Sequence, residues 1–183
     1  MDDLLIIGDL NEINKVIAGL KNHFSVKVED EINDYLSCKI QFSKDGTKAW
    51  IGQPHLIAKM ERTFSKEIKN LKVFATPGTP SFQIVRPEGK DEVIGKKEQS
   101  KYRTGVGMLL FLVKHSRPDI ANCTRELSKV LDGANEGAYK ELMRSIKFVM
   151  DTKNYGLRIE PKGEFNGEWE LRMYTDSDYA GDK

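Results

Sequence analysis

The spacing of apolar residues near the start of the chain predicts a strand followed by a helix. Leu4–Ile7 is a short apolar run that ends at Gly8, the pattern of a buried strand entering a turn. Asp9 with Glu12 three residues later is typical of a capped helix start. Leu10–Phe24 is therefore expected to be an amphipathic helix that packs one face on a sheet.

Alternation of apolar and polar residues then predicts a β-hairpin. Apolar residues occupy every second position from 36 to 42, as in a half-buried strand. Lys44-Asp45-Gly46 has turn chemistry, so Thr47–Gly52 is expected to return as the second arm. A helix should follow, with Leu56, Ile57, Met60 and Phe64 inward and Lys59, Arg62 and Lys66 outward.

The second half of the chain is expected to be mainly helical. An irregular connector rich in proline and glycine covers residues 73–100. Apolar spacing beyond it predicts helices over about Tyr102–His115, Asp119–Leu131 and Glu136–Asp151. The last of these should have one apolar face, made of Tyr139, Leu142, Ile146 and Val149. Tyr155–Ile159 and Glu168–Thr175 should pair around a turn at Gly163–Gly167. The pattern as a whole predicts the α+β class.

Composition narrows the class of protein without choosing a function. The 183 residues are 39% hydrophobic, enough for one packed core. The longest apolar run, Val106–Val113, is too short to cross a bilayer, and the first residues lack the basic leader of a secretory signal. Cys38 and Cys123 lie far apart, which argues against a disulfide framework or zinc site and favours an intracellular setting.

The net charge of +1 conceals an uneven distribution. Residues 96–150 carry 11 basic and 6 acidic side chains, whereas both flanking segments have an acidic excess. Lys140, Arg144 and Lys147 recur at helical spacing and form a basic stripe on the third predicted helix. Such a stripe is either an ordinary solvated face or a surface that contacts a polyanion.

The first residues carry the strongest chemical signal in the sequence. Two adjacent carboxylates, Asp2 and Asp3, are a solvated terminus or a pair of Mg²⁺ ligands. Together with the apolar run behind them, residues 2–8 resemble the Y-x-D-D-L-L-I-x-G core of copia-type retrotransposon reverse transcriptases. Further segments resemble motifs of that family in the same order: Tyr35–Ile40, Gln53–Phe64, Thr76-Pro77, Tyr102–Leu109, Arg117–Ile120, Tyr155–Leu157 and Tyr174–Asp182.

This resemblance covers essentially the whole chain and implies a domain order. The chain is similar to the part of a copia-type (Pseudoviridae-like) LTR retrotransposon polyprotein that runs from the reverse transcriptase into ribonuclease H. Residues 1–72 would end the palm, an antiparallel sheet plus helix, and 73–100 would be a connector. Residues 101–152 would form the helical thumb and connection, and 153–183 the first strands of a ribonuclease H-like domain.

The resemblance also implies roles in metal and primer binding. Asp2 and Asp3 would be two of three palm carboxylates that hold Mg²⁺ or Mn²⁺, and Asp176 the first metal-binding carboxylate of ribonuclease H. The strand Tyr35–Ile40 would be the primer grip, with its contacts made by Tyr35, Leu36, Ser37 and Cys38.

Contacts to a bound duplex are implied for the helical segment. Gly105 and Gly107 would let the thumb helix approach a groove, the alternative being plain helix–helix packing. Lys140, Arg144 and Lys147 would contact phosphates of an RNA/DNA template–primer duplex, the alternative being a solvated face.

Departures from the family's pattern shape the functional expectation. The family's third palm aspartate precedes the position of Asp2, Ser37 stands where the primer grip usually has glycine, and Lys183 comes before the other ribonuclease H carboxylates. We therefore expect a fragment of an RNA-directed DNA polymerase that is inactive alone, intracellular and cytoplasmic, with no membrane association. The alternatives are a non-catalytic nucleic-acid-binding module and a non-functional retroelement remnant; self-association is left open.

Overall fold

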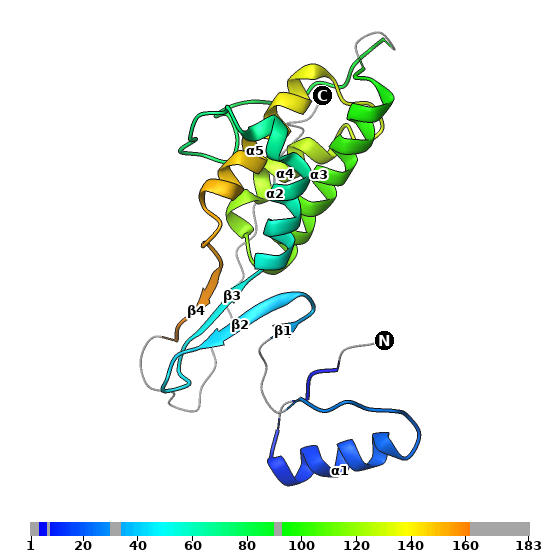
Figure 1. The fold of residues 1–183 in the computed structure, drawn as a ribbon, viewed down its shortest axis with the longest axis vertical. Helices are drawn as coiled ribbons and strands as arrows, with labels where there is room; N and C mark the ends of the chain where they lie inside the picture. The colour runs from blue at the N-terminus through cyan, green and yellow to red at the C-terminus, as the bar shows by residue number, and fades with distance from the viewer. Residues whose placement is uncertain (1–3, 7, 30–33, 90–92, 162–183) are drawn as a thin grey trace, which may run out of the picture.

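The molecule combines a helical body with a small sheet and a separate N-terminal helix (Figure 1). Our computed structural model describes residues 4–6, 8–29, 34–89 and 93–161. Helices and antiparallel strands are both present, which confirms the α+β class. Within this part of the chain, no helix is both long enough and apolar enough to span a bilayer.

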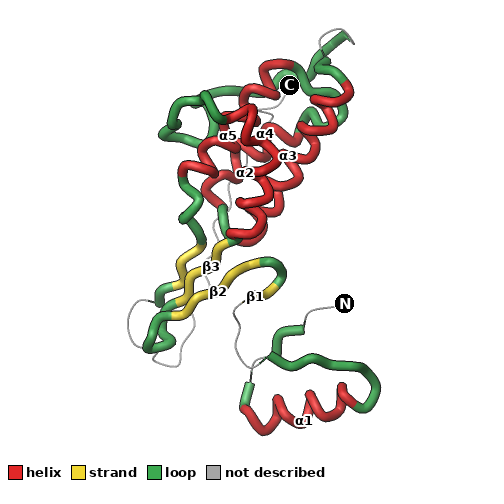
Figure 2. The backbone as a smooth tube through the Cα atoms, in the orientation of Figure 1, coloured by secondary structure: helices red, strands yellow, loops and turns green. Residues whose placement is uncertain are grey.

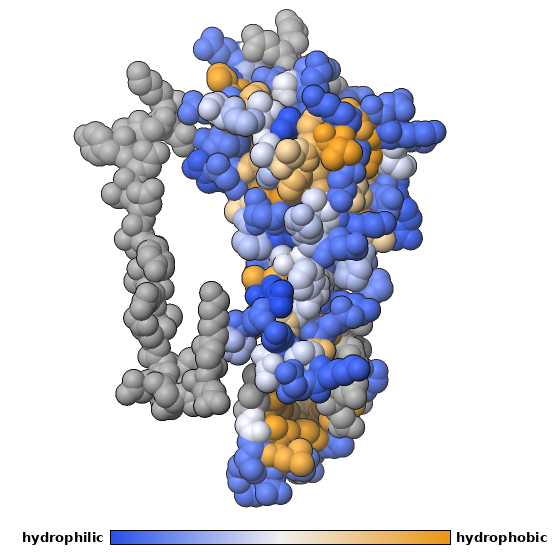
Figure 3. Space-filling view, turned by 90° about the vertical axis from the view of Figure 1, so that its left-hand side faces the viewer, coloured by the Kyte–Doolittle hydropathy of each residue, from blue (hydrophilic) through white to orange (hydrophobic). Residues whose placement is uncertain are grey.

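The first helix, α1 (Leu10–Lys21), has the predicted start but not the predicted packing. The Asp9 carboxylate accepts a hydrogen bond from the Asn11 N–H at 2.9 Å, which confirms the N-cap. None of its residues is buried, so the expected packing on a sheet is wrong. Figure 2 shows α1 set apart from the strands. Figure 3 shows hydrophobic residues at the surface at the lower end of the molecule, the level at which Figure 1 draws α1.

The strand expected at Leu4–Ile7 is not found. Leu4–Ile6 have no regular structure, Leu4 is 67% exposed, and Ile7 lies outside the described residues. None of the strands that the structure describes pairs with this segment. An apolar run forms a strand only where a neighbour satisfies its backbone groups, so the local pattern was insufficient here.

A four-stranded antiparallel sheet lies next to the helical body, in the order β1-β2-β3-β4. Its strands are β1 (Asp34–Tyr35), β2 (Cys38–Phe42), β3 (Ala49–Gly52) and β4 (Leu157–Ile159). The turn between β2 and β3 matches the prediction, with Gly46 at a φ of 70° and Asp45 accepting from the Thr47 N–H at 3.2 Å. Hydrogen bonds from Ser43 and Thr47 lower the pKa of Asp45 to about 2.

The expected continuous strand Tyr35–Ile40 is instead a tight hairpin. Tyr35 pairs with Cys38, and the two residues between them have positive φ values, 49° for Leu36 and 63° for Ser37. Two consecutive left-handed residues are the signature of a type I′ turn, whose twist matches that of paired strands. Leu36-Ser37 does not predict such a turn, because its two central positions usually hold glycine or asparagine.

The fourth strand pairs with a partner that the sequence did not indicate. Ile51 of β3 lies opposite Leu157 of β4, so β4 extends the hairpin sheet. The partner predicted for it, Glu168–Thr175, lies outside the described residues. Gly156 makes the approach possible, because a Cβ at this position would collide with the carbonyl oxygen of Ile51.

The helical body consists of four α-helices around one core. They are α2 (Pro54–Ile68), α3 (Lys96–His115), α4 (Ala121–Ser128), which follows the 3₁₀ turn η2 (Pro118–Ile120), and α5 (Glu136–Asp151). The inward faces predicted for α2 and α5 are confirmed: Met60, Phe64, Leu142 and Ile146 are fully buried. Helix α3 begins at Lys96, inside the stretch 73–100 that was expected to be irregular, and Gly95 precedes it as N-cap.

Candidate nucleic-acid interface

The proposed metal ligands lie outside the residues that the structure describes. Asp2, Asp3 and Asp176 are all in this category. Among the described residues, no group of three or more His, Cys, Asp or Glu side chains could hold a metal ion. Metal binding by these three carboxylates therefore stays a prediction from the sequence.

The four residues expected to grip a primer form the hairpin turn. Leu36 and Ser37 are exposed at its tip, Tyr35 is half-buried, and Cys38 is 5% exposed. The Cys38 thiol lies 3.8 Å from the Leu36 carbonyl oxygen, and burial raises its pKa. Only the turn itself, Leu36-Ser37, is thus presented to a ligand.

The segment Arg117–Ile120, which resembles the R-P-D-I motif, is structural. Arg117 is 1% exposed and binds the Asp119 carboxylate through two hydrogen bonds, from Nε at 2.9 Å and Nη2 at 2.8 Å. Its guanidinium also donates to the carbonyl oxygen and hydroxyl of Thr152, just after α5. It lies 5.8 Å from the Phe148 ring centroid and 5.5 Å from that of Tyr155. Arg117 therefore ties the end of α3 to the end of α5.

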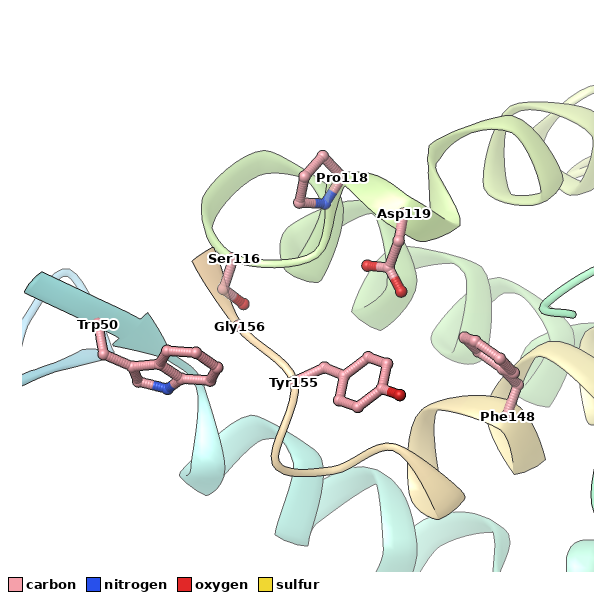
Figure 4. Close-up of a pocket in the computed structure, with 7 residues that line it drawn as sticks. All are labelled: Trp50, Ser116, Pro118, Asp119, Phe148, Tyr155 and Gly156. Carbon is pink, nitrogen blue, oxygen red and sulfur yellow. The ribbon is translucent and has the colours of Figure 1, made fainter. Parts of the chain in front are cut away.

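A shallow pocket adjoins this cluster. Its volume is about 350 Å³, and Figure 4 shows the Tyr155 ring between those of Trp50 and Phe148, with Asp119 above it. The lining is largely apolar, and the Asp119 carboxylate is already bound to Arg117. The pocket thus offers aromatic surface with little free polar chemistry.

The basic stripe predicted on α5 is largely occupied by contacts within the chain. Arg144 donates to the Thr76 hydroxyl at 2.9 Å and lies 4.5 Å from the ring centroid of Phe74. Lys147 is paired with Asp151, and only Lys140 is exposed. Because two of its three cations are engaged, the stripe is not the free phosphate-binding surface that the sequence predicted.

These contacts on α5 hold the Thr76-Pro77 segment in place. Ser145 donates to the Pro77 carbonyl oxygen at 2.9 Å, and Glu141 accepts from the Thr79 hydroxyl at 2.9 Å. The Thr76-Pro77 segment, which resembles the family's T-P motif, is therefore a loop held against α5.

The two glycines of α3 have different surroundings. Gly105 is buried, and a Cβ there would lie 3.0 Å from atoms of both Phe64 on α2 and Leu142 on α5. Its expected role at a nucleic-acid groove is therefore corrected to the alternative, helix–helix packing. Gly107 is exposed with nothing within 4 Å of such a Cβ, so its role stays a prediction.

A different basic surface, on α2, is free. The α2 face is defined as Lys59, Arg62, Lys66 and Lys69, all four of which are exposed. Intervals of three, four and three residues place these cations on one side of the helix. The core-facing residues Met60 and Phe64 lie on the opposite side. None of the four pairs with a carboxylate in the part of the chain that the structure describes.

The sequence predicts the outward position of the α2 cations but does not distinguish them as a candidate interface. Lys59, Arg62 and Lys66 have the spacing of the polar side of any amphipathic helix. The charge excess in residues 96–150 favours α5 instead. Only the contacts in the folded chain distinguish the engaged cations of α5 from the free cations of α2.

Two of the known proteins to which the chain is similar come from plant transposons. The chain is 26% identical over 185 aligned positions to the retrovirus-related Pol polyprotein from transposon TNT 1-94 of Nicotiana tabacum, and 27% identical over 184 to that from transposon RE1 of Arabidopsis thaliana. Both matches cover 100% of this chain but only 13% and 12% of the polyproteins. Secreted RxLR effector protein 161 of Plasmopara viticola is 30% identical over 81 residues, 44% of this chain and 54% of that protein.

No family model matches the chain, and no solved structure matches it either. The two polyprotein matches nevertheless extend along all of the sequence in which the ordered motifs were found. The chain is thus similar, from one end to the other, to a short section of the Pol polyproteins of plant retrotransposons.

Proposed function

We propose that this chain is the thumb-side section of a copia-type reverse transcriptase, an RNA-directed DNA polymerase, continuing into the start of ribonuclease H. The observation that carries the proposal is the whole-length similarity to the two plant Pol polyproteins. The order of the motifs, from residues 2–8 to Tyr174–Asp182, supports the same section of the polyprotein.

The α2 face is the proposed contact surface for a template–primer duplex. Its four cations span about 15 Å along the helix at 1.5 Å per residue. One strand of a duplex carries a phosphate about every 3.4 Å along its axis, so about four phosphates fall within this length. Exposed cations that form no ion pair with the described carboxylates suit phosphate contacts, because no such pair has to be broken first.

The hairpin turn and the carboxylates complete the proposal. Leu36 and Ser37, at the exposed tip of the β1–β2 hairpin, would contact the primer. Asp2, Asp3 and Asp176 would be metal ligands, since carboxylate oxygens suit Mg²⁺ and Mn²⁺. When bound, such an ion supplies charge stabilisation for nucleotidyl transfer.

The proposal is tested by measuring binding of the purified chain to a fluorescently labelled RNA–DNA hybrid by anisotropy across a series of salt concentrations. We expect an association constant that falls steeply with salt, because phosphate contacts release counterions. Binding that is absent at 50 mM salt, or indifferent to salt, would contradict it.

The second candidate is a nucleic-acid-binding module that works without polymerase chemistry. It is favoured by the α2 face, because contacts from exposed cations to phosphates need no polymerase chemistry. The genomic reading frame on either side separates the candidates. A frame open into a palm strand upstream and a ribonuclease H remainder downstream would favour the polymerase, whereas stop codons on both sides would favour the module or a non-functional remnant.

A further inference from the structure

A second hollow, of about 300 Å³, lies between the sheet and the segment that follows α5. Its lining includes Lys39 and Gln41 from β2, Trp50 from β3, Gln53 at the start of α2, and Lys153 and Tyr155. It shares Trp50 and Tyr155 with the pocket beside Arg117 (Figure 4).

The charge around this hollow is positive. Lys39 and Lys153 are both exposed, and neither forms an ion pair with any carboxylate among the described residues. The described lining contains no Asp or Glu side chain. Two like charges facing one cavity repel each other and favour an anion between them.

Gln53 adds an unused hydrogen-bond donor. The side chain is 1% exposed, and its Oε1 accepts from the Ser116 hydroxyl at 2.7 Å. Its Nε2 is buried without a partner among the described residues. A buried donor without a partner is rare in folded proteins, and a ligand in the hollow would supply the missing acceptor.

The start of α2 reinforces this preference for an anion. Gln53 is its N-cap residue and makes no side-chain capping bond, while Pro54 occupies the first turn. The free N–H groups and the positive end of the helix dipole therefore lie at the edge of the hollow. Helix N-termini of this kind bind phosphate in many proteins.

Aromatic side chains suggest what else the ligand carries. Trp50 and Tyr155 both line the hollow, and Tyr155 is 58% exposed. A planar base stacks well on such rings without regard to its identity. A ligand that carries both a phosphate and a planar base is a nucleotide.

We propose that this hollow binds one nucleotide, with its phosphate held by Lys39, Lys153 and the Gln53 amide and its base stacked on Tyr155. The nucleotide is either free or one unit of a single strand; both have the same chemistry. The proposal does not depend on duplex binding by the α2 face, because it rests on other residues.

The test uses Trp50 as a reporter. The chain has two tryptophans, so Trp169→Phe leaves Trp50 as its only indole. We expect saturable quenching of its fluorescence by dAMP or by an eight-residue oligo(dA), and binding at least about tenfold weaker for deoxyadenosine, which lacks the phosphate. Saturation by dAMP identifies a free nucleotide as sufficient, and saturation by the oligonucleotide alone identifies a strand.

Substitutions of the two lysines supply the decisive comparison. Lys39→Gln with Lys153→Gln should weaken binding at least about tenfold, whereas Lys44→Gln, an exposed lysine outside the lining, should not. Lys59→Gln with Lys66→Gln on the α2 face should leave dAMP binding unchanged. Lys153→Gln alone, with unaltered thermal unfolding, provides a milder variant should the double variant not fold.

Two outcomes would overturn the proposal. One is a failure of both dAMP and the oligonucleotide to bind at millimolar concentration, measured also by equilibrium dialysis of the unaltered chain. The other is equal affinity for dAMP and deoxyadenosine, which would mean that the phosphate is not recognised.

Discussion

Arg117 is a buried cation whose one carboxylate partner among the described residues, Asp119, reaches the solvent. The Arg117 side chain is 1% exposed and that of Asp119 is 41% exposed. An ion pair of such unequal burial responds differently to the loss of each member, because only one of the two charges can be solvated where it lies.

We therefore expect Asp119→Ala to be more destabilising than Arg117→Met. The first leaves a buried guanidinium without its counter-charge and should lower the free energy of unfolding by about 3 kcal/mol. The second leaves a carboxylate that water can reach, and keeps part of the packing against Phe148 and Tyr155. Urea unfolding of both variants measures the difference, and a larger loss for Arg117→Met would refute this account of the pair.

Ser37 carries a backbone conformation that suits glycine better. Its φ of 63° lies in the left-handed region, where a Cβ is disfavoured by about 1–2 kcal/mol. In the family motif that this segment resembles, the position of Ser37 is usually glycine. The left-handed turn gives a physical reason for that glycine.

Ser37→Gly should therefore stabilise the chain, by about 0.5–1 kcal/mol. The matched control is Ser65→Gly on the exposed side of α2, where the same substitution should destabilise by up to about 1 kcal/mol because glycine is a poor helix former. Thermal unfolding of the two variants decides the matter. Destabilisation by both would mean that the turn does not have the left-handed geometry described.

At the scale of elements, α2, α3 and α5 meet at Gly105. The closest atoms to a Cβ there belong to Phe64 and Leu142, both fully buried, so neither side chain can move into solvent. A close helix contact of this kind requires the absence of a side chain at one point.

Gly105→Ala and Gly107→Ala should have opposite effects on stability. The first should destabilise by about 1 kcal/mol, the cost of overpacking reduced by the better helix propensity of alanine. The second, at an exposed position of the same helix, should stabilise by up to about 1 kcal/mol. Chemical unfolding monitored by circular dichroism tests both, and a stabilising Gly105→Ala would contradict the described packing.

An ion pair between α2 and α3 makes stability depend on pH. Burial disfavours ionised Glu67, but the hydrogen bonds to its carboxylate and the charges of Lys101 and Lys66 together outweigh burial, so the pKa of Glu67 is lowered from 4.5. A lowered pKa contributes stability above 4.5, and this contribution is lost as pH falls through the lower value. We expect Glu67→Gln to be less stable than the parent at pH 6, by up to about 1 kcal/mol, and equally stable near pH 2. A difference unchanged between these pH values would contradict the pair.

Local periodicity predicted the elements whose packing is also local. Helices α2 and α5 have the expected inward faces because one apolar stripe per helix is enough to define the core. Three features were not predicted: the lack of a strand in Leu4–Ile6, the exposed position of α1, and the pairing of β4 with β3. Each depends on a neighbour distant in sequence, and no spacing within a segment identifies that neighbour.

At the scale of the whole molecule, the contacts that each cation makes decide which basic surface is available to phosphates, more than the number of cations in a segment does. The sequence placed the basic excess in residues 96–150, yet Arg144 is engaged by Thr76, 68 positions away. Spacing shows which side chains share a helix face but not which of them are neutralised on folding. For that reason the candidate interface lies on α2 and not on α5.

We propose above that the α2 face binds the phosphates of a nucleic acid. Its most direct test is the salt dependence of RNA–DNA hybrid binding by the parent chain and by a variant in which Lys59, Arg62, Lys66 and Lys69 are all glutamine, with Lys140→Gln as the exposed control on α5. Each phosphate contact contributes about −0.9 to the slope of log K against log salt, so the fourfold variant should lose about 3 to 4 units of slope and the control at most about 1. Equal slopes for the parent and the fourfold variant would contradict the claim.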